Sequence, residues 1–245
     1  VTIRMSPFPF KEFLKSESEL KDIIRQPLKK ANRLITTSES LKNRLSDFSL
    51  KHVTVVNNPI DLDFFKIKEK NSRKNRILTV GRMEEQKGID ILLKAIKKLE
   101  EPFELTIGGD GSKLLEYKQL CTDLDLDGKV TWLGQLSRDQ VAIEMQKCSF
   151  YVLSSRHETF GNVILEAMSC GKPVVATRCG GPEEIVTNDT GLLCDISVDD
   201  LFAKINHMNK VYPSFDSSKI RKDAIDRYAP EVWIGNLEKV FRGML

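Results

Sequence analysis

Short apolar runs alternate with longer stretches of helical periodicity along the chain, and this alternation is most regular after residue 76. Continuous apolar runs are typical of strands buried on both faces of a sheet, and apolar residues at every third or fourth position indicate helices that cover it. The pattern therefore predicts an α/β fold with a doubly wound, Rossmann-like parallel sheet. Its strands are expected at residues 77–80, 104–107, 129–133, 150–153, 174–177 and 192–194.

Several helices between these strands carry start or stop signals. Apolar residues from Ile89 to Leu99 recur on one face, with lysines on the other. Ser137 with Gln140 predicts a capping box before a helix that reaches residue 147, and Ser197 with Asp200 predicts another. A further helix is expected to begin near Gly161 and to end at Gly171-Lys172-Pro173, because glycine ends helices and proline cannot continue them.

The first 60 residues predict a smaller set of elements. Strands are expected at 1–5, 34–37 and 53–56, and Ser38 is expected to cap a helix that runs to about residue 45. A helix is also expected over 16–31, capped by Ser16 or Ser18 and interrupted at Pro27. The segment 66–76 holds six basic residues and one acid, which is typical of a solvated linker.

Composition and charge exclude several classes of protein. At 245 residues, with 40% hydrophobic and 30% charged residues, the chain can bury a sizeable core. A net charge of +3 is too small to imply a nucleic-acid partner. No apolar run approaches the roughly 20 residues that cross a membrane. The five scattered cysteines lack metal-ligand spacing and favour reduced thiols in a cytoplasmic protein.

The stretch from residue 156 to 173 contains the most informative chemistry. Glu166 lies in a narrow polar stripe of a mostly apolar helix, and a solvent-facing stripe accounts for it equally well when the helix is considered alone. The loop before the helix adds a second carboxylate, Glu158, and a glycine next to a helix N-terminus, where free N–H groups favour anions. Two acids beside an anion site indicate a polyol that carries phosphate, as in a nucleotide sugar.

Two other loops follow predicted strands, whose carboxyl ends form the ligand crevice of a doubly wound sheet. In Gly81–Gly88, Arg82 can grip phosphate with its planar fork and Lys87 can add a point charge, although both could be solvated cations. Gly109 follows the next strand and could let the backbone approach a nucleotide, or could only serve a tight turn. The acidic segment 123–128 is interpreted as a solvated turn and not as a metal site.

Glu158 and Glu166 stand in a frame, E-x-F-G-N-V-x-L-E-A-M-x-C-G-x-P-V-V-A-T, that resembles the retaining glycosyltransferases of family 4, which have the GT-B fold. The frame V-G-R-x4-K-G around Arg82 and Lys87 looks like the diphosphate-binding loop of that family. The resemblance runs from about Leu34 to the C-terminus. It implies that residues 1–60 are the end of an N-terminal, acceptor-side domain, that 61–228 are the donor-binding domain, and that 229–245 form a helix crossing back to the first domain.

The resemblance also implies an activity: transfer of a sugar from a nucleotide diphosphate sugar, such as a UDP-sugar, to a hydroxyl acceptor with retention of configuration. The implied acceptor is a glycan or lipid-linked saccharide, as in polysaccharide biosynthesis. No metal or other cofactor and no nucleic acid are expected. The resemblance implies a cytoplasmic protein. It also allows peripheral association with the inner face of the membrane, through the part of the N-terminal domain that the chain lacks.

Residue by residue, the resemblance assigns ribose binding to Glu166 and a donor-sugar contact to Glu158. The catalytic residues it implies are Glu158, Arg82 and Lys87. The donor-binding residues it implies are Gly81, Arg82, Lys87, Gly109, Glu158, Phe160, Gly161, Asn162, Val163 and Glu166, with Gly180 and Gly181 as secondary candidates.

Three alternatives remain open. One is a non-catalytic nucleotide-binding module, and another is a nucleotide-sugar epimerase with the same GT-B architecture. The third, a nicotinamide-dependent dehydrogenase, is disfavoured because Gly81-Arg82-Met83 stands where its full G-x-G-x-x-G fingerprint should begin.

Overall fold

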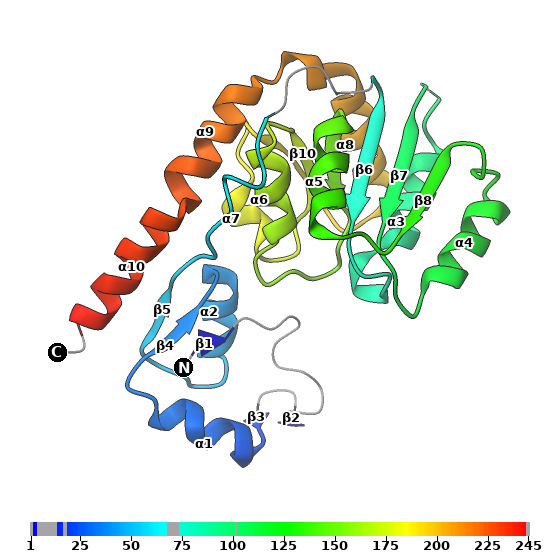
Figure 1. The fold of residues 1–245 in the computed structure, drawn as a ribbon. Coiled ribbons are helices and arrows are strands. Elements are labelled where there is room, and N and C mark those ends of the chain that lie inside the picture. The colour runs from blue at the N-terminus through cyan, green and yellow to red at the C-terminus, as the bar shows by residue number, and fades with distance from the viewer. Residues whose placement is uncertain (1, 4–13, 17–18, 68–73, 101, 244–245) are drawn as a thin grey trace.

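The computed structural model describes residues 2–3, 14–16, 19–67, 74–100 and 102–243. They form a large α/β unit around a six-stranded sheet and a smaller unit around a three-stranded sheet (Figure 1). A two-stranded hairpin, β2 (Leu14–Ser16) and β3 (Glu19–Leu20), belongs to the smaller unit.

The large sheet is parallel throughout, which confirms the predicted fold class. The strand order reverses between β6 and β9, the first and fourth strands of this sheet along the chain. Such a reversal is the topological switch point at which doubly wound sheets bind ligands. From edge to edge the strands are β11 (Gly191–Cys194), β10 (Val174–Thr177), β9 (Phe150–Leu153), β6 (Arg76–Val80), β7 (Glu104–Gly108) and β8 (Val130–Gly134).

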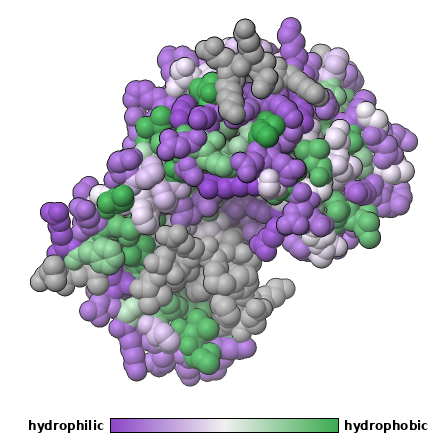
Figure 2. Space-filling view, in the orientation of Figure 1, coloured by the Kyte–Doolittle hydropathy of each residue, from purple (hydrophilic) through white to green (hydrophobic). Residues whose placement is uncertain are grey.

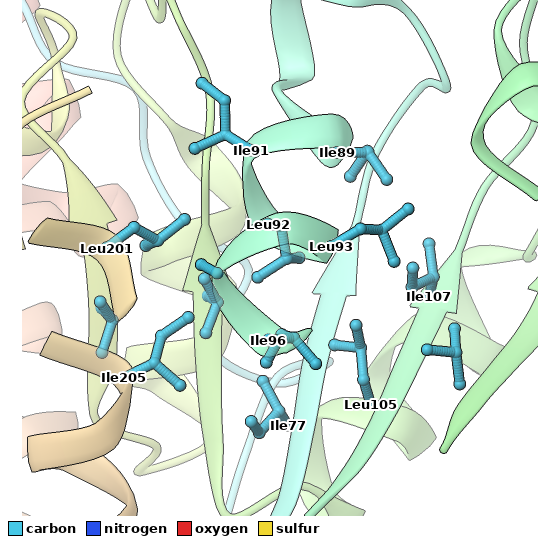
Figure 3. Packing of buried hydrophobic residues seen from close by; sticks show 14 of the residues in the cluster. Ile77, Ile89, Ile91, Leu92, Leu93, Ile96, Leu105, Ile107, Leu201 and Ile205 are labelled. Carbon is cyan, nitrogen blue, oxygen red and sulfur yellow. The ribbon is translucent and has the colours of Figure 1, made fainter. Parts of the chain in front are cut away.

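Neighbouring residues of a strand point to opposite faces of the sheet. Because apolar side chains occupy both faces here, helices cover both. Ile77 of β6 packs in a cluster with residues of α3 and α8 (Figure 3), whereas Leu78 packs with residues of α5, α6 and α9. The helices of this unit are α3 (Ile89–Lys97), α4 (Leu114–Asp123), α5 (Arg138–Lys147), α6 (Asn162–Ser169), α7 (Pro182–Ile185), α8 (Val198–Val211), α9 (Ser217–Tyr228) and α10 (Pro230–Arg242), with 3₁₀ turns η2 (Glu85–Lys87) and η3 (Tyr212–Ser214).

In the large unit, the predicted capping and stop signals are borne out, with one correction. Ser137 and Gln140 form the full capping box of α5, and Gly161 and Cys170 bound α6 as expected. At α8 the Ser197 side chain accepts the N–H of Asp200, but the Asp200 carboxylate accepts the N–H of Asp195. The predicted second capping box is therefore only half formed, because a nearer backbone donor takes the carboxylate.

The smaller unit is a parallel sheet, β1 (Thr2–Ile3), β4 (Leu34–Thr36) and β5 (Val53–Val55), in the order β1-β4-β5, with α2 (Glu39–Ser46) capped by Ser38 as predicted. The helix expected over 16–31 is wrong in its first part. Ser16 ends β2, and α1 (Asp22–Lys30) begins only after Leu20 is buried in the hairpin. Pro27 lies inside α1 without breaking it.

The basic linker expected over 66–76 falls partly on residues 68–73, outside the described part of the chain. Its last member is no linker residue: Arg76 begins β6, is 4% exposed, and pairs with Glu144 of α5 at 2.5 Å. All five cysteines are buried and free of disulfides. Among the helices of the described segments, none has both the length and the apolar character that a membrane crossing requires.

After the last strand, α9 and α10 run one after the other from the large unit to the level of β4 and β5 (Figure 1). Phe241, near the end of α10, is 56% exposed. Trp233 is half-buried.

Candidate functional site

The loops that follow β6 (residues 81–88, the β6 loop) and β9 (residues 154–161, the β9 loop) meet at the switch point of the large sheet. Between them and the start of α6 lies a cleft of about 390 Å³. Nine of the ten predicted site residues line it, namely Gly81, Arg82, Lys87, Glu158, Phe160, Gly161, Asn162, Val163 and Glu166. The parallel sheet brings them together because carboxyl ends of parallel strands share one edge.

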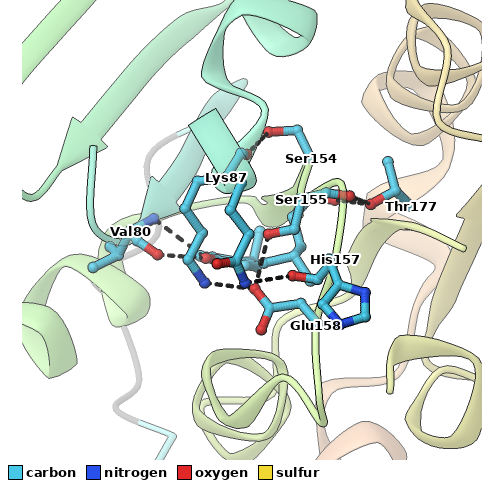
Figure 4. A network of polar contacts seen from close by, with 10 residues as sticks. Val80, Lys87, Ser154, Ser155, His157, Glu158 and Thr177 are labelled. Carbon is cyan, nitrogen blue, oxygen red and sulfur yellow. Dashed lines mark hydrogen bonds and ion pairs between the residues drawn. The ribbon is translucent and has the colours of Figure 1, made fainter. Parts of the chain in front are cut away.

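The β6 and β9 loops are joined by a charged pair at the centre of the cleft (Figure 4). Lys87 Nζ donates to Glu158 Oε1 at 2.5 Å, and Ser155 Oγ donates to the same oxygen at 2.8 Å. Glu158 is only 8% exposed, so its charge needs these partners. The other oxygen, Oε2, accepts no hydrogen bond from any described residue, and it remains available to a ligand. The sequence did not indicate that the two predicted charges bind each other.

Glu166 lines the same cleft from α6 and is half-buried. Burial raises the pKa of this carboxyl to about 7, and the charge of Arg138 opposes the rise only in part. Arg138 itself is held by Asp61 at 3.1 Å and stacks on Phe64 at 4.5 Å. Water stabilises the ionised form of a carboxyl in such a place only poorly, so hydroxyl donors of a ligand would stabilise it further.

Glu166 is expected to make the protein less stable as the pH rises from about 5 to 7. The folded protein keeps this carboxyl protonated up to its raised pKa of about 7, whereas the unfolded chain ionises it near 4.5. Between these values the unfolded state binds fewer protons, so the free energy of unfolding falls by about 3 kcal/mol and is flat above them. Urea unfolding at pH 5 and pH 8 should show this fall in the parent protein and lose most of it in Glu166→Gln. The same pH dependence in both proteins would contradict the assignment.

Arg82 connects this cleft to a second one of about 710 Å³, because Val80, Gly81 and Arg82 line both. Its side chain is exposed and forms no ion pair with any described residue. Gly109 lines the second cleft only. A Cβ at Gly109 would lie 1.8 Å from the Gly81 carbonyl oxygen, and its φ is +134°, so this glycine is required by the close packing of the two loops.

The smaller unit completes the cleft, which the surface displays as a hollow between the units lined by hydrophilic residues (Figure 2). Thr37 and Asn58 line it from that side, and Asn58 Nδ2 donates to Asn162 Oδ1 at 3.0 Å. The Glu184 carboxylate accepts the first two N–H groups of α2, from Glu39 and Ser40, at 2.9 Å each. Sequence reasoning missed Thr37 and Asn58, although Thr37 is the last residue of one predicted strand of the small sheet and Asn58 follows another.

Other predicted candidates lie elsewhere. Gly180 and Gly181 do not line the cleft but pack under the β9 loop: a Cβ at Gly181 would lie 2.1 Å from the Phe160 carbonyl oxygen. His157 does not line it either, and burial lowers the pKa of its imidazole. In the acidic segment 123–128, Asp123 ends α4 and Leu126 is buried, whereas Asp125 and Asp127 are exposed in the turn before the edge strand β8. Within the described residues no cluster of three metal-ligating side chains occurs.

A family model described as Glycosyl transferases group 1 matches residues 61–219, more than half of the chain. A similar curated protein, the uncharacterized glycosyltransferase MJ1178 of Methanocaldococcus jannaschii, is 37% identical over 166 residues. These residues cover 67% of this chain and 46% of that protein, so the chain spans about half the length of this relative.

Solved structures resemble the fold closely. Sucrose-phosphate synthase from Thermosynechococcus elongatus matches with a TM-score of 0.82 at 22% identity, over 94% of this chain and 64% of that one. The Anabaena protein HepE, solved with UDP and glucose, matches with a TM-score of 0.77 at 22% identity, over 87% of this chain and 63% of that one. At such identities the likeness bears on the fold, and it confirms the GT-B architecture.

Proposed function

The chain belongs to the glycosyl transferases group 1 family, and on that premise we propose that it carries the donor site of an enzyme that moves a sugar from a nucleotide diphosphate sugar to a hydroxyl acceptor. The observation that carries the proposal is the convergence of two cations, a buried and a half-buried carboxylate and a helix start on one cleft at the switch point. The cleft volume of about 390 Å³ suits a sugar with its diphosphate.

In this proposal the diphosphate lies against Arg82, Lys87 and the first residues of α6. Arg82 offers a planar fork that is not engaged by any described acid, and Lys87 offers a point charge. The N–H groups of residues at the start of α6 have no partner within the helix, so they favour an anion. Together these groups stabilise the negative charge that grows on the departing diphosphate.

The two glutamates bind different parts of the donor. Glu166 accepts hydrogen bonds from the ribose, and Oε2 of Glu158 accepts one from the donor sugar. Phe160, whose ring meets that of Tyr228 edge to face with centroids 5.7 Å apart, contributes through its backbone with Gly161, Asn162 and Val163. The nucleoside continues past Gly81 into the second cleft beside Gly109.

The proposed reaction retains configuration at the anomeric carbon. The bond from that carbon to the phosphate oxygen breaks, the acceptor hydroxyl oxygen bonds to the same face, and the hydroxyl proton ends on the released diphosphate. UDP is the proposed nucleotide, supported by the fold likeness to a protein solved with UDP and glucose.

We extend the proposal to the domain organisation. Residues 1–60 are the end of an acceptor-side domain, 61–228 the donor domain, and 229–245 the returning helix. The family model begins at residue 61, which supports the first boundary. The acceptor, a saccharide or lipid-linked saccharide hydroxyl, would approach from the side of Thr37 and Asn58.

Calorimetric titration of the chain with UDP, GDP and ADP, and with their sugar conjugates, tests the donor site. We expect micromolar to millimolar binding of one nucleoside diphosphate and its conjugate. Binding of none of the three would overturn the proposal. Binding without any transfer by the full-length protein would favour the non-catalytic nucleotide-binding module instead.

Donor binding should not depend on a divalent cation. The acidic segment 123–128 lies at the edge of the sheet away from the cleft, and the proposed diphosphate partners are Arg82, Lys87 and α6. The dissociation constant of the nucleotide sugar should therefore agree within about twofold in EDTA and in magnesium or manganese. Binding abolished by EDTA and restored by either metal would contradict this prediction.

A further inference from the structure

The β6 loop and the β9 loop are joined at their backbones as well as through Lys87 and Glu158. The Arg156 N–H donates to the Gln86 carbonyl at 2.7 Å, Gln86 Nε2 donates to the His157 carbonyl at 2.8 Å, and Ser154 Oγ donates to the Lys87 carbonyl at 3.0 Å. These bonds hold Lys87 itself and the residue before it.

The Arg156 side chain adds a third element to this junction. Its Nη1 donates to the Glu85 carbonyl at 2.8 Å and to Asp90 Oδ1 at 2.8 Å, and its Nη2 donates to Asp90 Oδ2 at 2.7 Å. Asp90 is the second residue of α3. One guanidinium thus binds the 3₁₀ turn that contains Lys87 to the start of the following helix, in the bidentate geometry that gives Arg–carboxylate pairs their orientation.

Arg156 does not line the ligand cleft. It lies behind the β6 loop, in a separate hollow lined with Asp90, Glu85 and Tyr117 among others. The pair is partly shielded, with the Arg156 and Asp90 side chains 33% and 25% exposed. The Arg156 side chain can therefore affect a ligand in the cleft only indirectly, through the backbone of residues 85–87 that it binds or through the β9 loop to which it belongs.

Gly88 fixes the other side of Lys87. Its φ is +61°, and a Cβ there would lie 2.1 Å from the Ser154 carbonyl oxygen. Lys87 is therefore held between a close loop contact on one side and the Arg156 contacts on the other. The position of the Lys87 backbone limits where its flexible side chain can place the ammonium group.

We propose that Arg156 and Asp90 are positioning residues whose bidentate pair holds the 3₁₀ turn so that the Lys87 ammonium stands at Glu158 and faces the diphosphate. The proposal rests on the proposed function for the identity of the ligand. The placement of Lys87 itself can be tested without any ligand.

The ligand-free test measures how fast an amine-acylating reagent modifies Lys87, by mass spectrometry of peptides. In the parent protein, Lys87 is half-buried and held by Glu158, so acylation should be slow. Asp90→Asn and the conservative Arg156→Lys should each accelerate it severalfold without changing acylation of Lys222 on α9. Asp125→Asn is the matched control, because it removes the exposed partner of Lys97 at the other end of α3.

The ligand test compares the dissociation constants of UDP and of uridine at a temperature well below unfolding. Asp90→Asn and Arg156→Lys should each weaken UDP binding about tenfold, the size of one lost charge-assisted contact, and leave uridine unchanged. The exchanged pair, Asp90→Arg with Arg156→Asp, should recover part of the loss. A purely structural role would lower the affinity for both ligands equally.

The outcomes separate the two proposals. If the parent binds no nucleoside diphosphate, the proposed function fails and the acylation rates alone decide the positioning role. If UDP binds to the parent and the two variants alike, or uridine weakens as much as UDP, the positioning role is wrong. Unchanged Lys87 acylation in both variants is equally decisive against it.

Discussion

Alanine at position 87 should weaken the binding of UDP by about a hundredfold, more than alanine at position 82. Lys87→Ala removes a phosphate contact and also strips Glu158, 8% exposed, of its cation 2.5 Å away. A buried carboxylate without its partner, next to an incoming diphosphate, adds repulsion to the lost contact. We expect about 3 kcal/mol for Lys87→Ala and about 1.5 kcal/mol, or tenfold, for the exposed Arg82→Ala.

Calorimetric titration with UDP measures both losses, with Lys94→Ala as a matched control on an exposed lysine of α3. The double variant Lys87→Ala, Glu158→Gln should bind UDP better than Lys87→Ala alone, because the stranded charge is gone. If the parent and both single variants bind UDP equally well, Arg82 and Lys87 do not contact the diphosphate. If Arg82→Ala weakens UDP binding more than Lys87→Ala does, the unpaired Glu158 carboxylate does not add the expected repulsion to the lost contact.

The large sheet was predictable because its strands are short apolar runs, and burial on both faces leaves little choice of structure for such runs. Phe150–Leu153 and Val174–Thr177 agree with the prediction to the residue. Errors fell where the signals are weak. Ser16 and Ser18 suggest helix caps, but Leu20 gains more from burial in a hairpin, and the helix starts after it.

Much of the candidate site was also predictable, because the residues that matter follow strands or open helices at one edge of a parallel sheet. What sequence order could not indicate is pairing across 71 positions, as between Lys87 and Glu158. Nor could it indicate that Asn58 of the smaller unit reaches Asn162, since that contact depends on how the two units meet. Gly109 and Gly181 suggested ligand contacts by their motifs, but both are required by loop packing.

Contacts between the units bear on how the cleft is formed. The Glu184 carboxylate binds two N–H groups of α2, and the Glu184 carbonyl accepts from Arg227 and from the Tyr228 hydroxyl. The Tyr228 ring in turn packs edge to face against Phe160 of the β9 loop. One glutamate therefore links the smaller unit, the end of α9 and the loop that carries Glu158.

The two glutamates of the cleft should respond differently to loss of charge. Glu166→Gln keeps the shape but weakens an acceptor that the proposal places against the ribose, so it should weaken UDP and the UDP-sugar about equally, by about tenfold. Glu158→Gln should weaken the UDP-sugar by a similar factor through Oε2. It should leave UDP unchanged or bound severalfold more tightly, because Lys87 then gives its whole charge to the diphosphate.

Titration of both variants with UDP and the UDP-sugar separates these roles, and Glu238→Gln, on an exposed pair of α10, is the control. A solvent-facing role for the stripe of α6 predicts almost no change from Glu166→Gln, as for most surface substitutions. That result would show that Glu166 does not bind the ribose. The raised pKa of Glu166, about 7, would then reflect burial alone. A loss of UDP affinity in Glu158→Gln would instead place Glu158 against the nucleotide, since freeing Lys87 can only favour a diphosphate that binds there.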